Sequence, residues 1–547
     1  MAAPSRADKA MERANEEEPD AAAAAAAAAV EEEKKLKLQP KEEEVNKENK
    51  SSSADAEEER VVVVVDSSHR NVAAPASATS HVVPVQVAPH VGSSTPYQTP
   101  PPQQHDQAVS LNSRRYTNRV SLLLFLLHFA AASIAVGFFV FKAAQGLART
   151  GTRSGRRESR LLRHWLPPVE ASAALSVLLA FAWQKAVRAW PAFMIRFILW
   201  SAFSTTMCAG VLLLCLSLPS AAGVGAALLA FSFGTGLYSC WVTRRAKFTA
   251  RVFAEALRPV GKFEGLNGPA YAMMLAGFVW ISLCCVAVVG AQSFDYPGLT
   301  VFGLVLSLAW TAEAMRNVAN LAASRVVALY YLRGMQCSVR FSFQRAVSVN
   351  LGSACLGSLF VPTIEACRIL ARGLNLLEGE DEFMFSCAHC CLHVMESIFH
   401  YGNSWAFVHI AAYGKGFVAA SKSTWGLFER QKMEELVDSD MTSSMCFLSG
   451  VSSGAVCVIF AASWTFATHK HYTATVSLFA FFVGYLMTRI GMAVPHACIG
   501  CYYVCYAENP STRIFDTTIP DQLALMQTGR SVRVPTPRYH PRRNATT

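Results

Sequence analysis

Charged residues are scarce in this chain: they make up 16% of its 547 residues, while 52% are hydrophobic. Soluble globular domains carry about 25% charged residues, so the composition argues against a soluble protein. It predicts an all-α polytopic membrane protein with about ten transmembrane helices and a soluble tail. The net charge of +10 is then expected beside anionic lipid in cytoplasmic loops, which argues against nucleic-acid binding.

Cysteine is absent before Cys208, and all sixteen cysteines lie between that residue and Cys505. Two pairs, at 387–390 and 498–501, have the CxxC spacing that indicates zinc or redox chemistry in a soluble loop. Nearly all the cysteines fall inside apolar segments. We therefore expect them to act as small packing residues that let helices approach closely.

The first 113 residues contain no apolar run long enough to cross a membrane. They hold an alanine run, acidic and lysine clusters and a proline-rich stretch, and such a composition cannot bury enough surface to offset the entropy of ordering. We predict that 1–113 is a disordered cytoplasmic tail. No signal-peptide core follows the initiator methionine, so the first apolar span is expected to direct insertion.

Long apolar runs dominate the rest of the chain. A bilayer core about 30 Å thick requires roughly 20 apolar residues per helix. This criterion predicts spans at 120–141, 168–183, 192–218, 221–243, 270–291, 299–323, 343–370, 386–412, 445–467 and 472–505. The expected organisation is a transmembrane domain at 114–510 and a cytoplasmic C-terminal tail at 511–547.

The distribution of lysine and arginine among the loops predicts the orientation. Basic residues cluster before the first span and after the second, fourth, sixth and eighth, whereas the loops after the third and fifth have none. By the positive-inside rule, both termini are expected in the cytoplasm. The loop between the first two spans disagrees, because it carries Arg149, Arg153, Arg156, Arg157, Arg160 and Arg163.

Polar residues inside apolar spans are costly, so each one is a candidate functional residue. In the sixth span, Glu313, Asn317 and Asn320 follow at i, i+4 and i+7, and Trp310 precedes them on the same face. An acid, two amides and an aromatic ring could hold a small organic cation. Alternatively, Glu313 pairs with Arg316 or Asn317 near the water interface and only orients the helix.

The seventh and tenth spans also contain unusual residues. Gly352, Gly357 and Pro362 could interrupt the seventh helix near mid-membrane, with Glu365 three residues beyond the proline. The same small residues would also suit tight helix packing. Arg489 in the tenth span requires an acidic partner or water, and the sequence does not reveal which.

Histidines line one face of the eighth span. His389, His393, Glu396 and His400 fall at i, i+4, i+7 and i+11, and the first three could hold zinc. A di-iron membrane oxidase would need several further histidine boxes, which this chain lacks. The alternative is that these histidines hydrogen-bond within the helix bundle or titrate near neutral pH. We predict no resident metal and no cofactor.

Five blocks resemble the choline transporter-like family. They are WTAEAMRNVANLAASRVVALYY at 310–331, SFQRA with GSACLGSL within 342–359, CCLHVME at 390–396, NSWAFVHIAAYGKGF at 403–417 and CYAENP at 505–510. The resemblance implies a ten-span plasma-membrane or organelle transporter of choline and related amino-alcohols, with both termini cytoplasmic. It implies no enzymatic activity.

The departures from the family pattern are informative. Many animal members have a long glycosylated loop after the first span, whereas this loop is short and has no glycosylation sequon. The chain is therefore more similar to the plant and fungal branch. Trp405 stands where the family has asparagine, and His393 and His400 stand where other members have different residues.

Choline makes specific physical demands on a site. Its quaternary ammonium has no N–H to donate, so aromatic faces must hold it, at about 0.5 to 2 kcal/mol per ring, with a carboxylate nearby and a polar group for the hydroxyl. The candidate rings are Trp310, Tyr330, Tyr331, Trp405 and Tyr413; the candidate acids are Glu313 and Glu365; the candidate amides are Asn317, Asn320 and Asn403.

Uptake of a cation needs no ATP. One positive charge moving through 100 mV gains about 2.3 kcal/mol, enough for roughly fifty-fold accumulation. The chain has no phosphate-binding GxxxxGK[ST] motif, so we predict facilitated, potential-driven transport, with membrane lipids as its surroundings. The alternatives are a proton-coupled carrier, a membrane metalloenzyme built on His389, His393 and Glu396, and a channel or lipid scrambler.

Overall fold

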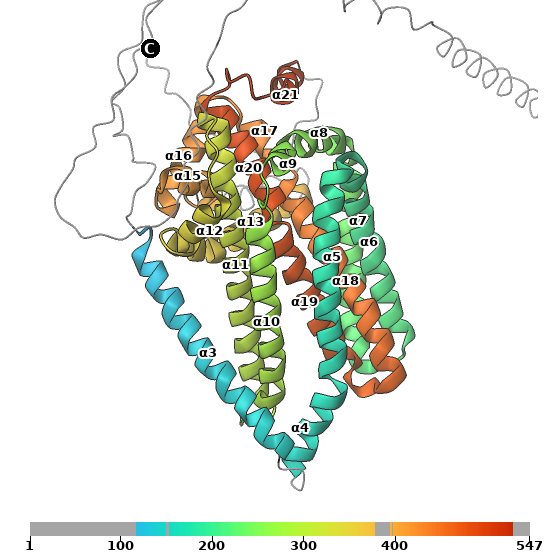
Figure 1. The fold of residues 1–547 in the computed structure, drawn as a ribbon. Coiled ribbons are helices and arrows are strands. Elements are labelled where there is room, and N and C mark those ends of the chain that lie inside the picture. Colours follow the sequence, from blue (N-terminus) through green and yellow to red (C-terminus); the bar gives the residue numbers. More distant parts are fainter. Residues whose placement is uncertain (1–115, 149–152, 378–393, 396–397, 529–547) are drawn as a thin grey trace, which may run out of the picture. The chain divides into compact units, whose positions relative to one another are not determined.

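A computed structural model describes residues 116–148, 153–377, 394–395 and 398–528, which fold into helices (Figure 1). The tail predicted at 1–113 and residues 529–547 lie outside this part of the chain. The long helices are α3 (Arg119–Ala148), α5 (Leu166–Ala189), α6 (Pro191–Cys215), α7 (Pro219–Val242), α10 (Gly268–Ala291), α11 (Pro297–Arg333), α13 (Leu351–Leu377), α18 (Thr442–Thr468) and α19 (Thr473–Gly491). The predicted all-α membrane fold is confirmed.

Eight helical stretches of the described residues are long and apolar enough to cross a membrane. A ninth is obtained if α12 (Val339–Val347) and the first part of α13, which are bent by 70° relative to each other, form one broken span. Proline in the first turn starts α5, α6, α7, α10 and α11, where its missing N–H costs nothing. Gly334, in the left-handed conformation with φ 64°, ends α11.

The seventh predicted span breaks at a different place from the one predicted. The helix is interrupted at 348–350, before Gly352, and α13 runs through Gly357 and Pro362. At the break, the Val349 carbonyl accepts a hydrogen bond from the Thr117 N–H at 3.1 Å. The two glycines serve the tight-packing alternative, because a Cβ on Gly352 would lie 2.3 Å from the Thr117 carbonyl oxygen.

The eighth and tenth predicted spans are not single helices. In the described part of the eighth span, residues 402–405 are not helical and α15 (Ala406–Tyr413) has only eight residues. The tenth span divides at Met492 into α19 and α20 (Ala493–Glu508). Pro495 in the first turn of α20 has no N–H to continue the hydrogen bonding of α19, which explains the division.

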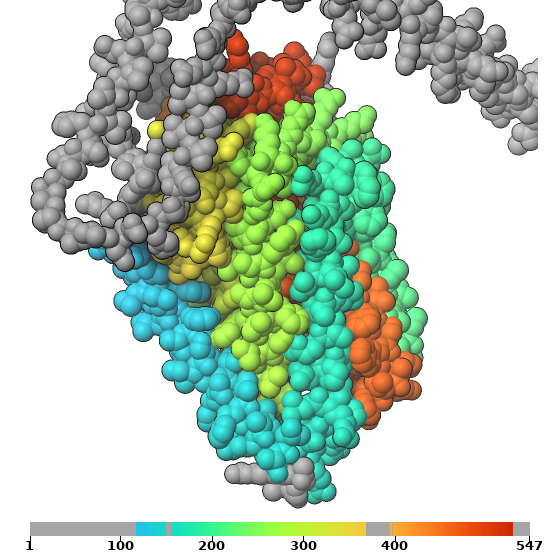
Figure 2. Space-filling view, in the orientation of Figure 1, coloured from blue at the N-terminus to red at the C-terminus, as the bar shows by residue number. Residues whose placement is uncertain are grey.

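The long helices form two groups. In the α18 group, α5, α6, α7, α18 and α19 pack on one another; in the α11 group, α3, α10, α11 and α13 do so. The groups meet where α19 contacts α10 and α11, and where α5 contacts α10. Figure 2 shows α3, α10 and α5 side by side on one face. Any polar contact between α11 and α19 therefore joins the two groups.

Short helices gather at one end of the bundle. They are η1 (Thr243–Arg245), α8 (Ala246–Ala256), α9 (Arg258–Lys262), α12, α15, α16 (Phe417–Arg430), α17 (Glu434–Asp438) and α21 (Thr518–Gln527). The arginine-rich α4 (Arg153–His164) lies at the opposite end (Figure 1). The described basic loops after the second, fourth, sixth and eighth predicted spans are at the end with α8, and α4, which carries most of the arginines of the discordant loop, is at the other (Figure 1).

Close packing of α3 on α10 depends on Gly290. A Cβ built there would lie 1.9 Å from the Phe139 carbonyl oxygen, which is backbone and cannot swing away. We expect Gly290→Ala to lower the free energy of unfolding by about 1–3 kcal/mol, because α3 must move outward. Thermal unfolding of the purified protein in detergent measures this. Gly303→Ala is the control, because its Cβ would meet nothing within 4 Å; equal losses would contradict the prediction.

Candidate functional site

The middle of α11 carries a layer of polar side chains inside the bundle. Arg316, Asn317 and Asn320 are buried, and Trp310 and Glu313 are partly buried. Every residue from 316 to 329 is buried, because α11 is surrounded by α3, α10, α13, α15, α19 and α20. This central position forces each polar group on α11 to find a partner on another helix or to remain unsatisfied.

Glu313 forms ion pairs with two arginines. Its Oε2 lies 2.7 Å from Arg316 Nη1, and its Oε1 lies 2.9 Å from Arg489 Nη2. Pairing with Arg316 is one of the two predicted alternatives. Arg489 of α19 is the partner that the sequence could not reveal, and it joins the α11 group to the α18 group. Two guanidiniums and one carboxylate leave the cluster with a net charge of +1.

This ion-pair cluster lies inside the helix bundle. Met315, two residues beyond Glu313, lies beside Gly277, and Gly277 is in the interior of α10 rather than at either end. The exposed fractions of the three side chains are 13% for Glu313, 7% for Arg316 and 9% for Arg489. Removing one partner from such a buried ion-pair network lowers the stability of the fold, because it leaves a buried charge without a counter-charge.

Trp310 lies one turn before Glu313 and faces α3 and α13. Its indole N–H donates to Ser358 Oγ at 2.9 Å. Its ring packs against His128, with centroids 4.4 Å apart, and edge-on against Phe125 at 5.4 Å. His128 was missed by the sequence analysis, although a histidine inside the first apolar span is the kind of signal that marks functional residues in membranes.

The two amides of α11 differ in how well they are satisfied. Asn317 Nδ2 donates to the Ala354 carbonyl at 3.3 Å, but its buried Oδ1 has no hydrogen-bond partner among the described residues. Asn320 Nδ2 lies 2.9 Å from His496 Nδ1, and its Oδ1 accepts from Ser324 at 3.0 Å. Asn317 thus offers a buried acceptor that a ligand hydroxyl could occupy, since an unmade buried hydrogen bond is costly.

The candidate residues do not converge on one point. Trp310 and Tyr331 are 21 residues apart on one continuous helix, which corresponds to about 31 Å at 1.5 Å per residue. A choline-sized ligand cannot contact both. Trp310, Glu313, Asn317 and Asn320 form a set in the middle of α11, which we call the α11 polar layer. Tyr330 and Tyr331 lie at its far end.

The residues at the far end make packing and capping contacts. Tyr330 accepts a hydrogen bond from Lys262 Nζ at 2.6 Å, and Tyr331 stacks on Phe515 with centroids 5.0 Å apart. The Trp405 ring lies edge-on to Phe428 and Tyr503. These rings therefore hold helices together at this end of the bundle.

Tyr413 belongs to a hydrogen-bonded cluster beyond the candidate spans. Its hydroxyl donates to Glu508, whose Oε2 lies 3.8 Å from His409 Nε2. His409 Nδ1 is 2.9 Å from Thr424 Oγ1. Burial opposes the charged form of Glu508, but hydrogen bonds from His409 and Tyr413 outweigh burial and hold its pKa below the usual value. The cluster fastens α15 to the end of α20.

Asn403 and Glu365 have different surroundings. Asn403 Oδ1 accepts from the Ala406 N–H at 3.1 Å, and its Nδ2 donates to the Ser421 carbonyl at 3.3 Å, so the side chain holds the turn before α15. Glu365 is half-buried and accepts from Ser443 Oγ at 3.5 Å. Among the described residues, no hydrogen bond or ion pair joins either side chain to the α11 polar layer.

The predicted histidine row falls almost entirely outside the described residues, including His389, His393 and Glu396. His400 is described; its Nδ1 lies 3.8 Å from Glu429 Oε1, and its ring lies beside Trp425. In the described part of the chain, no cluster of three or more metal-ligating side chains is present.

A further acid in the membrane, Glu170 of α5, was also missed. Ser282 of α10 donates to its Oε2 at 2.7 Å, and its buried Oε1 has no hydrogen-bond partner among the described residues. Its position inside the second predicted span was a sufficient signal to find it. Like Arg489, it joins the two helix groups.

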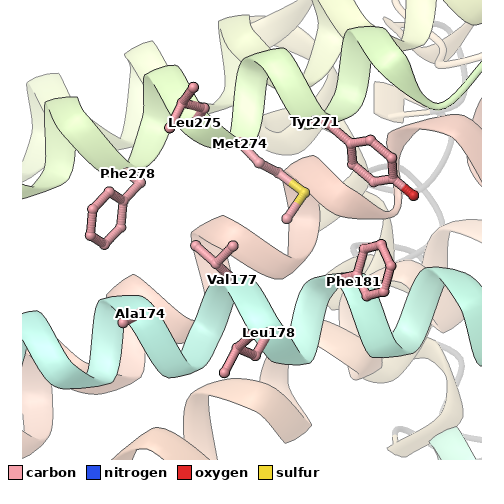
Figure 3. Close-up of a pocket in the computed structure, with 8 residues that line it drawn as sticks. All are labelled: Ala174, Val177, Leu178, Phe181, Tyr271, Met274, Leu275 and Phe278. Carbon is pink, nitrogen blue, oxygen red and sulfur yellow. The ribbon is translucent and has the colours of Figure 1, made fainter. Parts of the chain in front are cut away.

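An apolar groove of about 550 Å³ also lies between α5 and α10 (Figure 3). Its walls are formed by Ala174, Val177, Leu178 and Phe181 of α5 and by Tyr271, Met274, Leu275 and Phe278 of α10. Leu178 and Leu275 are 66% and 67% exposed, so the groove opens sideways. Its lining carries no charge, so it cannot neutralise a cation.

Comparison with known proteins identifies relatives of this chain. A family model described as plasma-membrane choline transporter matches residues 226–511, just over half of the chain. The chain is 24% identical over 308 residues to a CTL-like protein of Dictyostelium discoideum, covering 53% of each. It is 25% identical over 228 residues to protein PNS1 of Mycosarcoma maydis, covering 39% of this chain and 43% of the relative.

An animal protein is similar to a comparable extent. Choline transporter-like protein 5 of Xenopus tropicalis is 26% identical over 251 residues, which cover 41% of this chain and 35% of the relative. The chain spans about half the length, or less, of these curated relatives. The matched region of the family model contains α10, α11, α13, α18, α19 and α20, and therefore the whole α11 polar layer.

Proposed function

We propose, from the premise that this chain belongs to the choline transporter-like family, that it carries choline or a related amino-alcohol across the membrane. It is a multi-pass membrane protein of a transporter family, and its relatives include fungal proteins, as the short first loop predicted. We propose the plasma membrane as its location, with the end that bears α8 in the cytoplasm. The basic loops at that end support this orientation.

The α11 polar layer is the proposed substrate site. Trp310 supplies an aromatic face for the trimethylammonium group, and the unsatisfied Oδ1 of Asn317 accepts the choline hydroxyl. Glu313, between these two residues in sequence, is the counter-charge. Of the other predicted residues, Asn320 positions His496; Tyr330, Tyr331, Glu365, Asn403, Trp405 and Tyr413 hold the surrounding helices in place.

The ion pair between Glu313 and Arg489 is the observation that carries the mechanism, because it joins the α11 group to the α18 group. A carrier exposes its site alternately to either side by moving one helix group against another. That movement must break this pair. An arriving substrate cation replaces the Arg489 guanidinium beside Glu313. Substrate binding and the breaking of the ion pair between Glu313 and Arg489 are therefore a single exchange of one cation for another.

Membrane potential is the proposed driving force. Without substrate, the cluster of Glu313, Arg316 and Arg489 carries a net charge of +1. The substrate cation enters this cluster as Arg489 moves away, and the positive charge of the substrate crosses the bilayer once in each transport cycle. The gain is about 2.3 kcal/mol per 100 mV. No ATP and no coupled ion is needed for this mechanism.

Uptake into proteoliposomes tests the proposal. Purified full chain should take up radiolabelled choline saturably, faster with an inside-negative potential, and ethanolamine should compete. Uptake that does not saturate and is not competed would indicate a channel or scrambler. No uptake by folded protein would reject choline as substrate. Retention of stoichiometric zinc or iron, lost in His389→Ala/His393→Ala, would favour the metalloenzyme.

A further inference from the structure

A second polar site lies far from the α11 polar layer, at the end of the bundle that carries α8 and α21. A pocket of about 260 Å³ is lined by four basic side chains, Arg244, Arg245, Lys247 and Arg251. Asp521 of α21 is the acid in its lining, and Thr517 donates to that carboxylate at 3.0 Å. The lining therefore has a net charge of +3 in a small space.

The helical repeat brings these basic residues together. Arg244, Lys247 and Arg251 follow at i, i+3 and i+7 and are exposed, while Ala246, Thr249, Ala250, Val252 and Phe253 are buried on the other face. Among the described residues these three basic side chains pair with no carboxylate. Farther along, Arg258 pairs with Glu255 at 2.7 Å. Like charges packed this closely repel one another, and a bound anion would relieve the repulsion.

An exposed apolar stripe on α7 leads to this pocket. Phe233, Leu237 and Trp241 follow at intervals of four residues and are 61%, 75% and 46% exposed. The Arg245 guanidinium lies over the Trp241 ring, 4.4 Å from its centroid. A spanning helix presents such a stripe to acyl chains, and tryptophan marks the boundary between chains and headgroups. The pocket therefore begins where the acyl region ends.

We propose that the pocket binds the phosphorylated headgroup of an anionic membrane lipid whose acyl chains lie along α7. Four cations in one small pocket match a headgroup with more than one phosphate, and the phosphates would contact Arg244, Lys247 and Arg251. With this end in the cytoplasm, the site faces the leaflet that contains anionic lipids. The site does not overlap the α11 polar layer, and its test requires no transport.

Lipid binding to the purified full chain, measured by native mass spectrometry, tests the proposal. Short-chain phosphatidylinositol bisphosphate should bind, and phosphatidylcholine of the same chain length should not. The triple variant Arg244→Gln/Lys247→Gln/Arg251→Gln should lower the affinity at least tenfold. The matched control is Arg156→Gln/Arg157→Gln/Arg160→Gln, which removes the same charge from exposed positions on α4; it should change the affinity less than twofold.

Three outcomes would overturn the proposal. The first is unchanged binding in the α8 triple variant, with an unchanged melting temperature showing that it is folded. The second is an equal loss in the α4 control, which would show nonspecific attraction to charge. The third is equally tight binding of soluble inositol trisphosphate, which would assign the pocket to free phosphates rather than to a lipid.

Discussion

Glu313→Gln should lower the free energy of unfolding by about 3–5 kcal/mol, because it leaves two buried guanidiniums without a counter-charge. Both arginines now touch the Glu313 carboxylate, at 2.7 Å and 2.9 Å, and neither side chain is more than 9% exposed. The substitution would raise the charge of the cluster from +1 to +2. Thermal unfolding in detergent measures the loss, and choline uptake per folded molecule should fall below detection.

Arg489→Gln is the matched comparison. It removes the link between the helix groups but retains the 2.7 Å pair between Glu313 and Arg316, so the remaining cluster is neutral. We expect it to destabilise the protein much less than Glu313→Gln, and the double variant should be more stable than Glu313→Gln alone. The prediction is wrong if Arg489→Gln costs as much stability as Glu313→Gln.

The exchange mechanism makes a separate kinetic prediction for Arg489→Gln. Without the competing guanidinium, Glu313 is more available to the substrate, so the KM for choline should fall. Turnover should also fall, because the ion pair that joins the α11 group to the α18 group is missing. An increase in KM without a change in turnover would show that Arg489 does not compete with substrate for Glu313.

Trp310→Ala should raise the KM for choline by about 2- to 30-fold, the range that corresponds to the loss of one cation–π contact of 0.5 to 2 kcal/mol. The ring is half-buried beside His128 and Phe125, and it is the aromatic ring of the α11 polar layer. Trp310→Phe should recover most of the affinity because it keeps an aromatic face. Initial rates of uptake over a range of choline concentrations measure the effect.

Two controls separate the ring from its other contacts. Ser358→Ala removes the nearer acceptor of the indole N–H, at 2.9 Å, and leaves the Cys355 carbonyl at 3.5 Å and the ring in place. Trp464→Ala removes a tryptophan that is 40% exposed on α18. Both should leave the KM within about twofold of the parent. A large increase in Ser358→Ala would mean that the position of the ring, rather than its face, determines affinity.

Most of the secondary structure could be predicted because a run of about 20 apolar residues is a strong indication of a membrane-spanning helix. The spans of α6, α7 and α10, each a continuous and mostly apolar helix, agree with prediction to within a few residues. Errors occurred where a side chain replaces a backbone hydrogen bond, as Asn403 does before α15. Hydropathy averages over such a turn, so the broken eighth span could not be recognised from the sequence.

The sequence by itself determined the membrane fold, the family and the polar face of α11, since each depends on residue type and spacing along one chain. The tertiary structure alone decided which partners those residues have. Glu313 and Arg489 are 176 residues apart in sequence, and no periodicity relates positions on two helices that meet only after packing. The same packing left Asn317 Oδ1 unsatisfied and separated Trp310 from Tyr331, because the rigid rise of a helix keeps residues on successive turns apart.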